Sequence, residues 1–164
     1  MSEFQKIYDQ YGKQLYRFLL SLTGSREQAE ELMQEVFYQA LVHIDRFEGR
    51  SSMLTWLCQI GKNAWLKEIR RKKRYADTPY EELRLPDSTP TPEEAAIQKD
   101  TLRRVRQAVA NLEEPYRDVF ILHIFGGRPL KEIAAIYGKS ESWARVTYHR
   151  AKLKIQERMN EKNE

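Results

Sequence analysis

The residues best suited to chemistry lie in the last quarter of the chain, where a turn is followed by a basic segment. Residues 128–137 contain Pro129 and an apolar stripe at helical spacing, Gly138 and Ser140 follow, and basic side chains recur from Arg145 onward. Proline suits the first turn of a helix, glycine can end one, and serine can cap the next. This order predicts a helix-turn-helix, whose second helix enters the major groove of DNA. The alternative is a helical hairpin with a solvated basic face, but turn, caps and charge together favour DNA.

A second basic cluster closes the helix predicted for residues 53–74. This segment ends in the run Arg-Arg-Lys-Lys-Arg, has Lys62 and Lys67 upstream, and contains Trp56 and Trp65. Cations can follow phosphates while aromatic rings receive unstacked bases, so the composition suits a single-stranded nucleic acid. Judged on spacing alone, the two tryptophans belong more often to a core, and both interpretations stay open.

Helices must position these groups, because apolar residues recur at helical spacing through most of the chain and no strand signal appears. Gly24 ends the first helix, and Ser25 with Gln28 forms a capping box for the second, whose apolar stripe includes Leu41 and Ile44. An acidic segment with three prolines then reads as an extended linker. The predicted fold class is all-α, with two small helical domains at residues 1–75 and 92–164 joined by the linker at 76–91. In the second domain, helices are expected at about 92–111, 115–125, 129–137 and 141–159.

Charge is distributed in blocks along the chain. Residues 1–75 carry 13 basic and 9 acidic side chains, residues 76–100 carry 2 and 7, and residues 101–164 carry 13 and 8. Two basic blocks around an acidic connector indicate polyanionic partners, although a solvated charged face is the usual alternative.

Other function classes receive little support. Three scattered histidines, no phosphate-binding loop and no metal-ligand spacing argue against an enzyme, a cofactor or a metal site. Cys58 is the single cysteine and is expected to be a small buried side chain. No apolar run approaches membrane-spanning length, so a cytoplasmic protein is expected.

Three stretches together form a recognisable pattern. The first is residues 29–37, the second runs from Phe47 to Asn63 and on to the basic run, and the third comprises residues 116–120, 132–134 and 149–152. With these stretches in this order, the chain resembles the extracytoplasmic-function (ECF) sigma factors of bacterial RNA polymerase over residues 5–158. The pattern departs from the family at Glu113, where proline is usual, and at residues 142–144, where Gly-Thr-Val is commoner than Ser-Trp-Ala.

The resemblance implies a division of labour between the two domains. Residues 1–75 would be a sigma region-two-like domain that docks on core polymerase and recognises and melts the minus-ten element. Residues 92–164 would be a region-four-like domain whose helix-turn-helix recognises the minus-thirty-five element. The implied partners are core RNA polymerase, promoter DNA and an anti-sigma factor, with no membrane insertion of this chain.

The resemblance also implies particular contact residues. In the family, the loop matching residues 47–52, together with Asn63, forms a pocket for a base flipped from the non-template strand, and flipping costs a few kcal/mol of unstacking. The implied core-polymerase contacts are Glu30, Glu31, Gln34 and Glu35. The implied minus-ten contacts are Phe47, Gly49, Arg50, Ser51, Ser52, Trp56, Lys62, Asn63, Arg70, Arg71, Lys73 and Arg74. The implied minus-thirty-five contacts are Ser142, Trp143, Arg145, Val146, His149, Arg150 and Lys152.

Two rival functions remain open at this point. A stand-alone helix-turn-helix regulator explains residues 115–159 equally well, but it leaves the loop at Phe47, Asn63 and the acidic linker without a role. A helical adaptor that binds only protein explains the acidic face at residues 30–35, but not two basic helices. Promoter-specific initiation by core polymerase would distinguish a sigma factor from both.

Overall fold

A computed structural model describes residues 2–75 and 99–161 of the chain. Every regular element in these ranges is helical, as the sequence predicts. The elements of residues 2–75, here called the proximal module, are α1 (Glu3–Thr23), α2 (Arg26–His43), the short 3-10 helix η1 (Ile44–Arg46) and α3 (Met53–Tyr75). The elements of residues 99–161, here called the distal module, are α5 (Lys99–Ala110), α6 (Tyr116–Phe120), the π-helical turn η2 (Ile121–Phe125), α7 (Leu130–Ile136) and α8 (Glu141–Glu161).

Local signals set the helix ends in the proximal module. Gly24 has a φ of 69°, in the left-handed region, and its N–H donates to the Leu20 carbonyl at 2.8 Å, which ends α1. The Ser25 hydroxyl accepts a hydrogen bond from the Gln28 N–H at 3.3 Å and so caps α2. Both boundaries confirm the sequence prediction.

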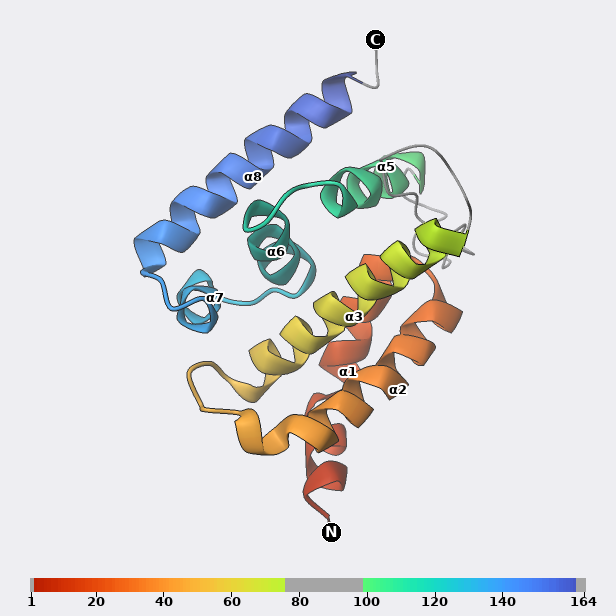
Figure 1. Cartoon of the computed structure of the whole chain (residues 1–164), viewed down its shortest axis with the longest axis vertical. Coiled ribbons are helices and arrows are strands. Elements are labelled where there is room, and N and C mark those ends of the chain that lie inside the picture. The colour runs from red at the N-terminus through yellow and green to blue at the C-terminus, as the bar shows by residue number, and fades with distance from the viewer. Residues whose placement is uncertain (1, 76–98, 162–164) are drawn as a thin grey trace.

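The two modules pack directly on each other (Figure 1). α1, α2 and α3 all pack against one another as a three-helix bundle, and α3 contacts both η2 and α7 while α1 contacts η2. The buried apolar side chains form one cluster that runs from the proximal into the distal module. The sequence predicted two domains and a linker, and it carried no signal for this shared interface.

Several details differ from the sequence-based expectations or lie beyond the structure. The single helix expected at 115–125 is α6 followed by η2, because the backbone changes to π-helical hydrogen bonding at Ile121. Leu41 and Ile44, expected to face inward, are 56% and 36% exposed, because they lie past the part of α2 that the core covers. The acidic linker at 76–91 and the capping box expected at its end lie outside the described residues.

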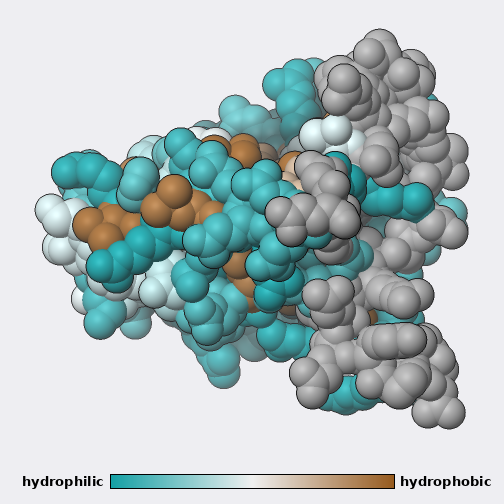
Figure 2. Space-filling view, turned by 90° about the horizontal axis from the view of Figure 1, so that it is seen from above, coloured by the Kyte–Doolittle hydropathy of each residue, from teal (hydrophilic) through white to brown (hydrophobic). Residues whose placement is uncertain are grey.

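Seen from above, the described surface is mostly hydrophilic, with separate small apolar patches between polar side chains (Figure 2). Among the described residues, no helix combines the length and the apolar character needed to cross a membrane.

Candidate functional site

The helix-turn-helix forms as predicted from local signals. Gly138 has a φ of 64° and follows α7, while the Ser140 hydroxyl accepts a hydrogen bond from the Trp143 N–H at 3.1 Å and caps α8. The inward stripe of α8 consists of small or apolar buried residues, namely Ala144, Thr147, Ala151 and Ile155. The opposite side is exposed and carries six of the residues predicted to contact DNA: Ser142, Arg145, Val146, His149, Arg150 and Lys152.

The seventh predicted residue, Trp143, has a structural neighbour. Its ring lies 5.9 Å from the ring of Tyr137, and the side chain is half-buried. Trp143 thus braces the turn between α7 and α8 while part of its surface stays accessible. Farther along α8, Lys154 lies 3.3 Å from the Glu113 carboxylate and over the ring of Tyr116, so it is engaged within the distal module.

The loop before α3 presents an aromatic pair. The rings of Phe47 and Trp56 lie 5.3 Å apart, and both side chains are partly exposed. Between them, Gly49 has a φ of 74° and open space around it. Trp65, in contrast, is 3% exposed and belongs to the core, so the core interpretation is confirmed for that tryptophan.

Charged and polar groups extend from this loop along α3. Arg50 forms an exposed ion pair with Glu48 at 2.8 Å, and such exposed pairs are weak. Asn63 is exposed on α3. At the C-terminal end of the helix, Arg70, Arg71 and Arg74 are exposed and Lys73 is half-buried, so the basic run faces solvent.

Lys62 has a different environment from the other predicted DNA contacts. Its ammonium is 3.1 Å from Asp118 Oδ2 and 3.0 Å from the Tyr137 hydroxyl, and the side chain is 1% exposed. Burial lowers the pKa of Lys62, while Asp118 partly offsets this by favouring the charged form. Burial alone would raise the pKa of Asp118, but Lys62 and Arg117 outweigh burial and lower it. Lys62 can therefore reach DNA only if the modules separate.

Ser52 is also engaged across the interface. The Glu132 carboxylate of α7 accepts hydrogen bonds from the Ser52 N–H and from the Thr55 hydroxyl, the latter at 3.2 Å. Glu132 thereby sits at the N-terminus of α3, where the orphan N–H groups and the helix dipole favour an anion. Nothing in the spacing of Asp118, Glu132 or Tyr137 points to α3, so the sequence did not predict them as partners of Ser52 and Lys62.

A third polar contact between the two modules joins α5 to the C-terminal end of α1. Arg106 of α5 is 6% exposed, and its Nε donates to the Ser21 carbonyl in the last turn of α1 at 2.9 Å. A cation at this end complements the negative end of the helix dipole.

The four acidic and amide residues predicted to bind core polymerase are all exposed on α2, but they lie on two sides of it. Glu30 and Gln34 line a groove of about 970 Å³ between α1 and α2. Glu31 and Glu35 line a separate hollow between α2 and α3. The pairs separate because residues four apart share one side of a helix while neighbours do not.

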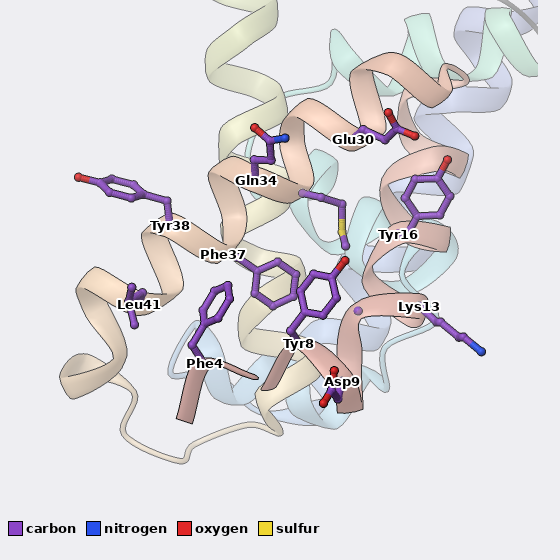
Figure 3. A pocket seen from close by; sticks show the side chains of 12 residues that line it. Phe4, Tyr8, Asp9, Lys13, Tyr16, Glu30, Gln34, Phe37, Tyr38 and Leu41 are labelled. Atoms are coloured by element: carbon purple, nitrogen blue, oxygen red, sulfur yellow. The ribbon is translucent and has the colours of Figure 1, made fainter. Parts of the chain in front are cut away.

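The groove between α1 and α2 has an aromatic floor. The Phe37 ring lies 5.7 Å from Phe4 and 5.1 Å from Tyr8, and Figure 3 shows these rings gathered between the two helices. Tyr38 and Leu41 continue the apolar surface along α2 and are 63% and 56% exposed. The sequence prediction recognised the polar residues of this face and missed the apolar ones.

The described residues offer no group of three or more potential metal ligands. Cys58 is 1% exposed, as expected, and burial raises its pKa to about 12, so the thiol is unreactive in this arrangement.

Comparisons with known proteins agree with the division into two modules. Residues 7–75 match the family described as Sigma-70 region 2, and residues 102–155 match Sigma-70, region 4. The ECF RNA polymerase sigma factor SigX of Bacillus subtilis is 32% identical over 152 residues, covering 90% of this chain and 78% of SigX. The RNA polymerase sigma factor YlaC of the same organism is 30% identical over 162 residues, covering 98% of this chain and 94% of YlaC.

Solved structures share the fold. CnrH, solved in complex with the cytosolic domain of CnrY, aligns with a TM-score of 0.58 at 21% identity, covering 96% of this chain and 87% of CnrH. The sigma factor RpoE of Bartonella quintana, solved with the anti-sigma factor NepR, aligns with a TM-score of 0.59 at 22% identity, covering 98% of each chain.

Proposed function

Because this chain belongs to the ECF sigma factors of bacterial RNA polymerase, we propose that its two modules divide the steps of transcription initiation. The protein is a transcription initiation factor that binds core RNA polymerase, directs it to specific promoters and promotes DNA melting. One observation carries this function: a region 2 match and a region 4 match occur on one chain, at residues 7–75 and 102–155. A stand-alone helix-turn-helix regulator would account only for the second match.

The exposed polar residues on two sides of α2 form the proposed docking surface for core polymerase. Its four members, Glu30, Glu31, Gln34 and Glu35, are exposed, so a partner can reach them without rearrangement of the core. Exposed carboxylates of this kind give specificity and association rate through charge complementarity. The apolar side chains of Tyr38 and Leu41 beside them supply contact area.

The loop before α3 and α3 itself form the proposed minus-ten surface. The Phe47–Trp56 pair offers rings on which an unstacked base can stack, and Asn63 offers an amide for its edge. The remaining proposed contacts of the loop and helix are Gly49, Arg50, Ser51, Ser52, Lys62, Arg70, Arg71, Lys73 and Arg74. The exposed arginines would hold the adjoining phosphates.

The exposed side of α8 is the proposed minus-thirty-five surface. Arg145 lies near the N-terminal end of α8, the part of a recognition helix that reaches base edges, and an arginine can bind guanine bidentately. Val146 is 49% exposed and can contact a thymine methyl group. The proposed contacts to the DNA backbone are Ser142, Trp143, His149, Arg150 and Lys152.

An anti-sigma factor is the proposed third partner. Two proteins that share this fold, CnrH and RpoE, were solved bound to CnrY and to the anti-sigma factor NepR. The aromatic groove between α1 and α2 is an apolar surface of the kind that protein partners cover.

In vitro transcription with core polymerase tests the function. Core enzyme with this protein should produce discrete transcripts from a fragment library of the source genome, and core enzyme alone should not. A helix-turn-helix regulator would bind fragments without starting transcripts, and that result would reject the assignment.

A further inference from the structure

One hollow of the described surface is lined by cations and by no carboxylate. It lies where α1 and α3 meet the loop of residues 126–129, which joins η2 to α7, and its volume is about 390 Å³. Among the described residues that line it, Arg17 and Arg128 are the only charged ones. The groove between α1 and α2 and the hollow between α2 and α3 both carry charges of either sign. The hollow with two arginines therefore favours an anion.

Both arginines keep hydrogen-bond donors available. Arg17 of α1 is exposed and has no hydrogen-bond or ion-pair partner among the described residues. Arg128 is half-buried, and its Nε donates to the Gly126 carbonyl at 3.2 Å, while its two Nη atoms have no partner in the same part of the chain. Guanidinium groups bind phosphate oxygens through such N–H groups, often two at a time.

The loop backbone adds a third donor. The N–H groups of Gly126 and Arg128 donate to the Ile121 and Leu122 carbonyls at 3.2 and 3.0 Å, but the Gly127 N–H has no partner among the described residues. Gly127 has a φ of 61°, and a Cβ added there would meet nothing within 4 Å. A ligand can therefore approach this backbone closely, and a backbone N–H is a strong donor to an anionic oxygen.

The other walls of the hollow are apolar. Phe18 of α1, Leu54 of α3 and Phe125 of η2 line it beside the arginines. Sites for small molecules are mostly apolar with a few convergent polar groups, and about 390 Å³ lies at the lower end of their usual volume. A nucleic acid needs a longer row of cations to follow its phosphates, as α3 and α8 provide. The size and the charge of this hollow thus suit a small phosphorylated molecule.

We propose that this hollow binds the phosphate group of a small molecule through Arg17, Arg128 and the Gly127 N–H. None of these three donors belongs to the proposed polymerase or promoter surfaces, so the site is additional to them. Arg17 comes from the proximal module and the other two donors from the distal one, so the bound molecule contacts both modules.

The single cysteine of the chain reports on occupancy without any added label. Cys58 of α3 lines the same hollow and is 1% exposed. Burial raises the pKa of its thiol to about 12, and the Arg128 guanidinium acts in the opposite direction, as expected of a nearby cation. A ligand that binds only the covered form slows labelling of the thiol by a factor of one plus the ratio of ligand concentration to Kd.

The test follows labelling of Cys58 by a disulfide reagent in the full-length protein at constant ionic strength. Inorganic phosphate, adenosine monophosphate and adenosine are titrated separately. The two phosphate compounds should slow labelling about tenfold at a concentration of about ten times Kd, and adenosine should not. Tighter binding of adenosine monophosphate than of inorganic phosphate supports an organic phosphate that uses the apolar wall, and equal binding supports inorganic phosphate as the ligand.

Two variants assign the binding to the hollow. Arg17→Gln and Arg128→Gln should each raise the Kd about tenfold or more, because each removes charge-assisted hydrogen bonds to phosphate. The control is Arg26→Gln, which removes the same charge at an exposed position in the first turn of α2, outside the hollow, and it should keep the wild-type Kd. Arg128 also binds its own loop, so Arg17→Gln alone decides the matter if Arg128→Gln changes the labelling rate without ligand.

Three results would overturn the inference. In the first, neither phosphate compound slows labelling, or adenosine slows it as much as adenosine monophosphate does. In the second, both arginine variants keep the wild-type Kd, or Arg26→Gln weakens binding as much as Arg17→Gln does. In the third, a random-sequence DNA duplex slows labelling while the small phosphates do not, which would assign the two arginines to the DNA backbone.

Discussion

The ammonium of Lys62 on α3 lies 3.1 Å from Asp118 Oδ2 on α6, and the two side chains are 1% and 7% exposed. Arg117 holds the other oxygen of the same carboxylate at 2.8 Å, so one buried aspartate joins two cations. A buried charge is costly unless it is paired, and each partner here satisfies the other only while the modules touch. Lys62, a proposed DNA contact, therefore stays buried for as long as the two modules are packed together.

The contact between the two modules should weaken in acid, below the ordinary carboxyl pKa values. Asp118 is faced by Lys62, Arg117 and Tyr137, and the two cations lower its pKa although burial alone would raise it. The pKa of Glu132 is also lowered, because the hydrogen bonds that it accepts from Ser52 and Thr55 outweigh the effect of burial. Carboxylates with lowered pKa values stabilise the contact between the modules when the pH is above their ordinary pKa values, 3.8 for Asp118 and 4.5 for Glu132. This stabilisation is lost as the pH falls through the lowered pKa values.

Small-angle X-ray scattering across this range measures the effect. The radius of gyration should increase as the pH falls below 4.5 while circular dichroism still reports helices. Glu132→Gln should show a smaller pH dependence than the wild type, because it lacks one of the two titrating groups. Equal titration curves for the two proteins would exclude Glu132 as a pH-dependent contact.

The two sides of α2 should contribute differently to core binding. Charge reversal of Glu31 and Glu35 should weaken the affinity for core polymerase because these carboxylates are exposed. The matched variant reverses Glu30 and replaces Gln34 with lysine on the groove side of the same helix. Affinity measured by fluorescence anisotropy then assigns the docking side, and undiminished affinity in both variants would contradict docking through this face.

Asn63→Ala should impair melting more than binding. Asn63 is exposed on α3, so its loss leaves the core intact while removing an amide from the proposed base pocket. Open-complex formation should fall more than closed-complex formation, and a premelted template should partly rescue the variant because unpairing has already occurred. Equal losses on duplex and premelted templates would argue against a role in melting.

Arg145→Ala should change the base preference of α8. Arg145 is exposed, and its pair with Glu141 at 3.5 Å is too weak to hold it away from DNA. If it reads guanine, its loss costs about 1–3 kcal/mol at one promoter position. Lys152→Ala should instead weaken all sequences alike and reduce the salt dependence of binding. If Arg145→Ala and Lys152→Ala show the same relative affinities over a set of promoter variants, Arg145 has no role in base preference that Lys152 lacks.

Gly24→Ala should destabilise the protein more than Gly138→Ala. Both glycines follow a helix with positive φ, at 69° and 64°, so an alanine is strained by about 1 kcal/mol or more at either site. At Gly24 the added Cβ would also lie 2.5 Å from the Arg106 guanidinium, whereas Gly138 has nothing within 4 Å. Urea unfolding measures the difference in the free energy of unfolding, which reports the cost of displacing the Arg106 guanidinium from the end of α1. Equal losses in the two variants would show that the Arg106 side chain moves aside at no measurable cost.

The sequence by itself determined the elements that depend on neighbouring residues. Gly24, Ser25 and Ser140 set helix ends through hydrogen bonds that span at most four residues. The exposed face of α8 follows from helical periodicity, because small and apolar residues on the opposite stripe turn the basic ones outward. The family resemblance then implied that this exposed face of α8 contacts the minus-thirty-five element.

Only the tertiary structure decided which of these faces are available. The contacts that bury Lys62 and engage the Ser52 N–H join residues 75 and 80 positions apart, as in Lys62–Tyr137 and Ser52–Glu132. No periodicity or capping pattern encodes such a pairing, because it arises from packing one folded module against another. For the same reason, Lys62 reads as one more surface cation in the sequence and is the most deeply buried charge of the α3 interface in the fold.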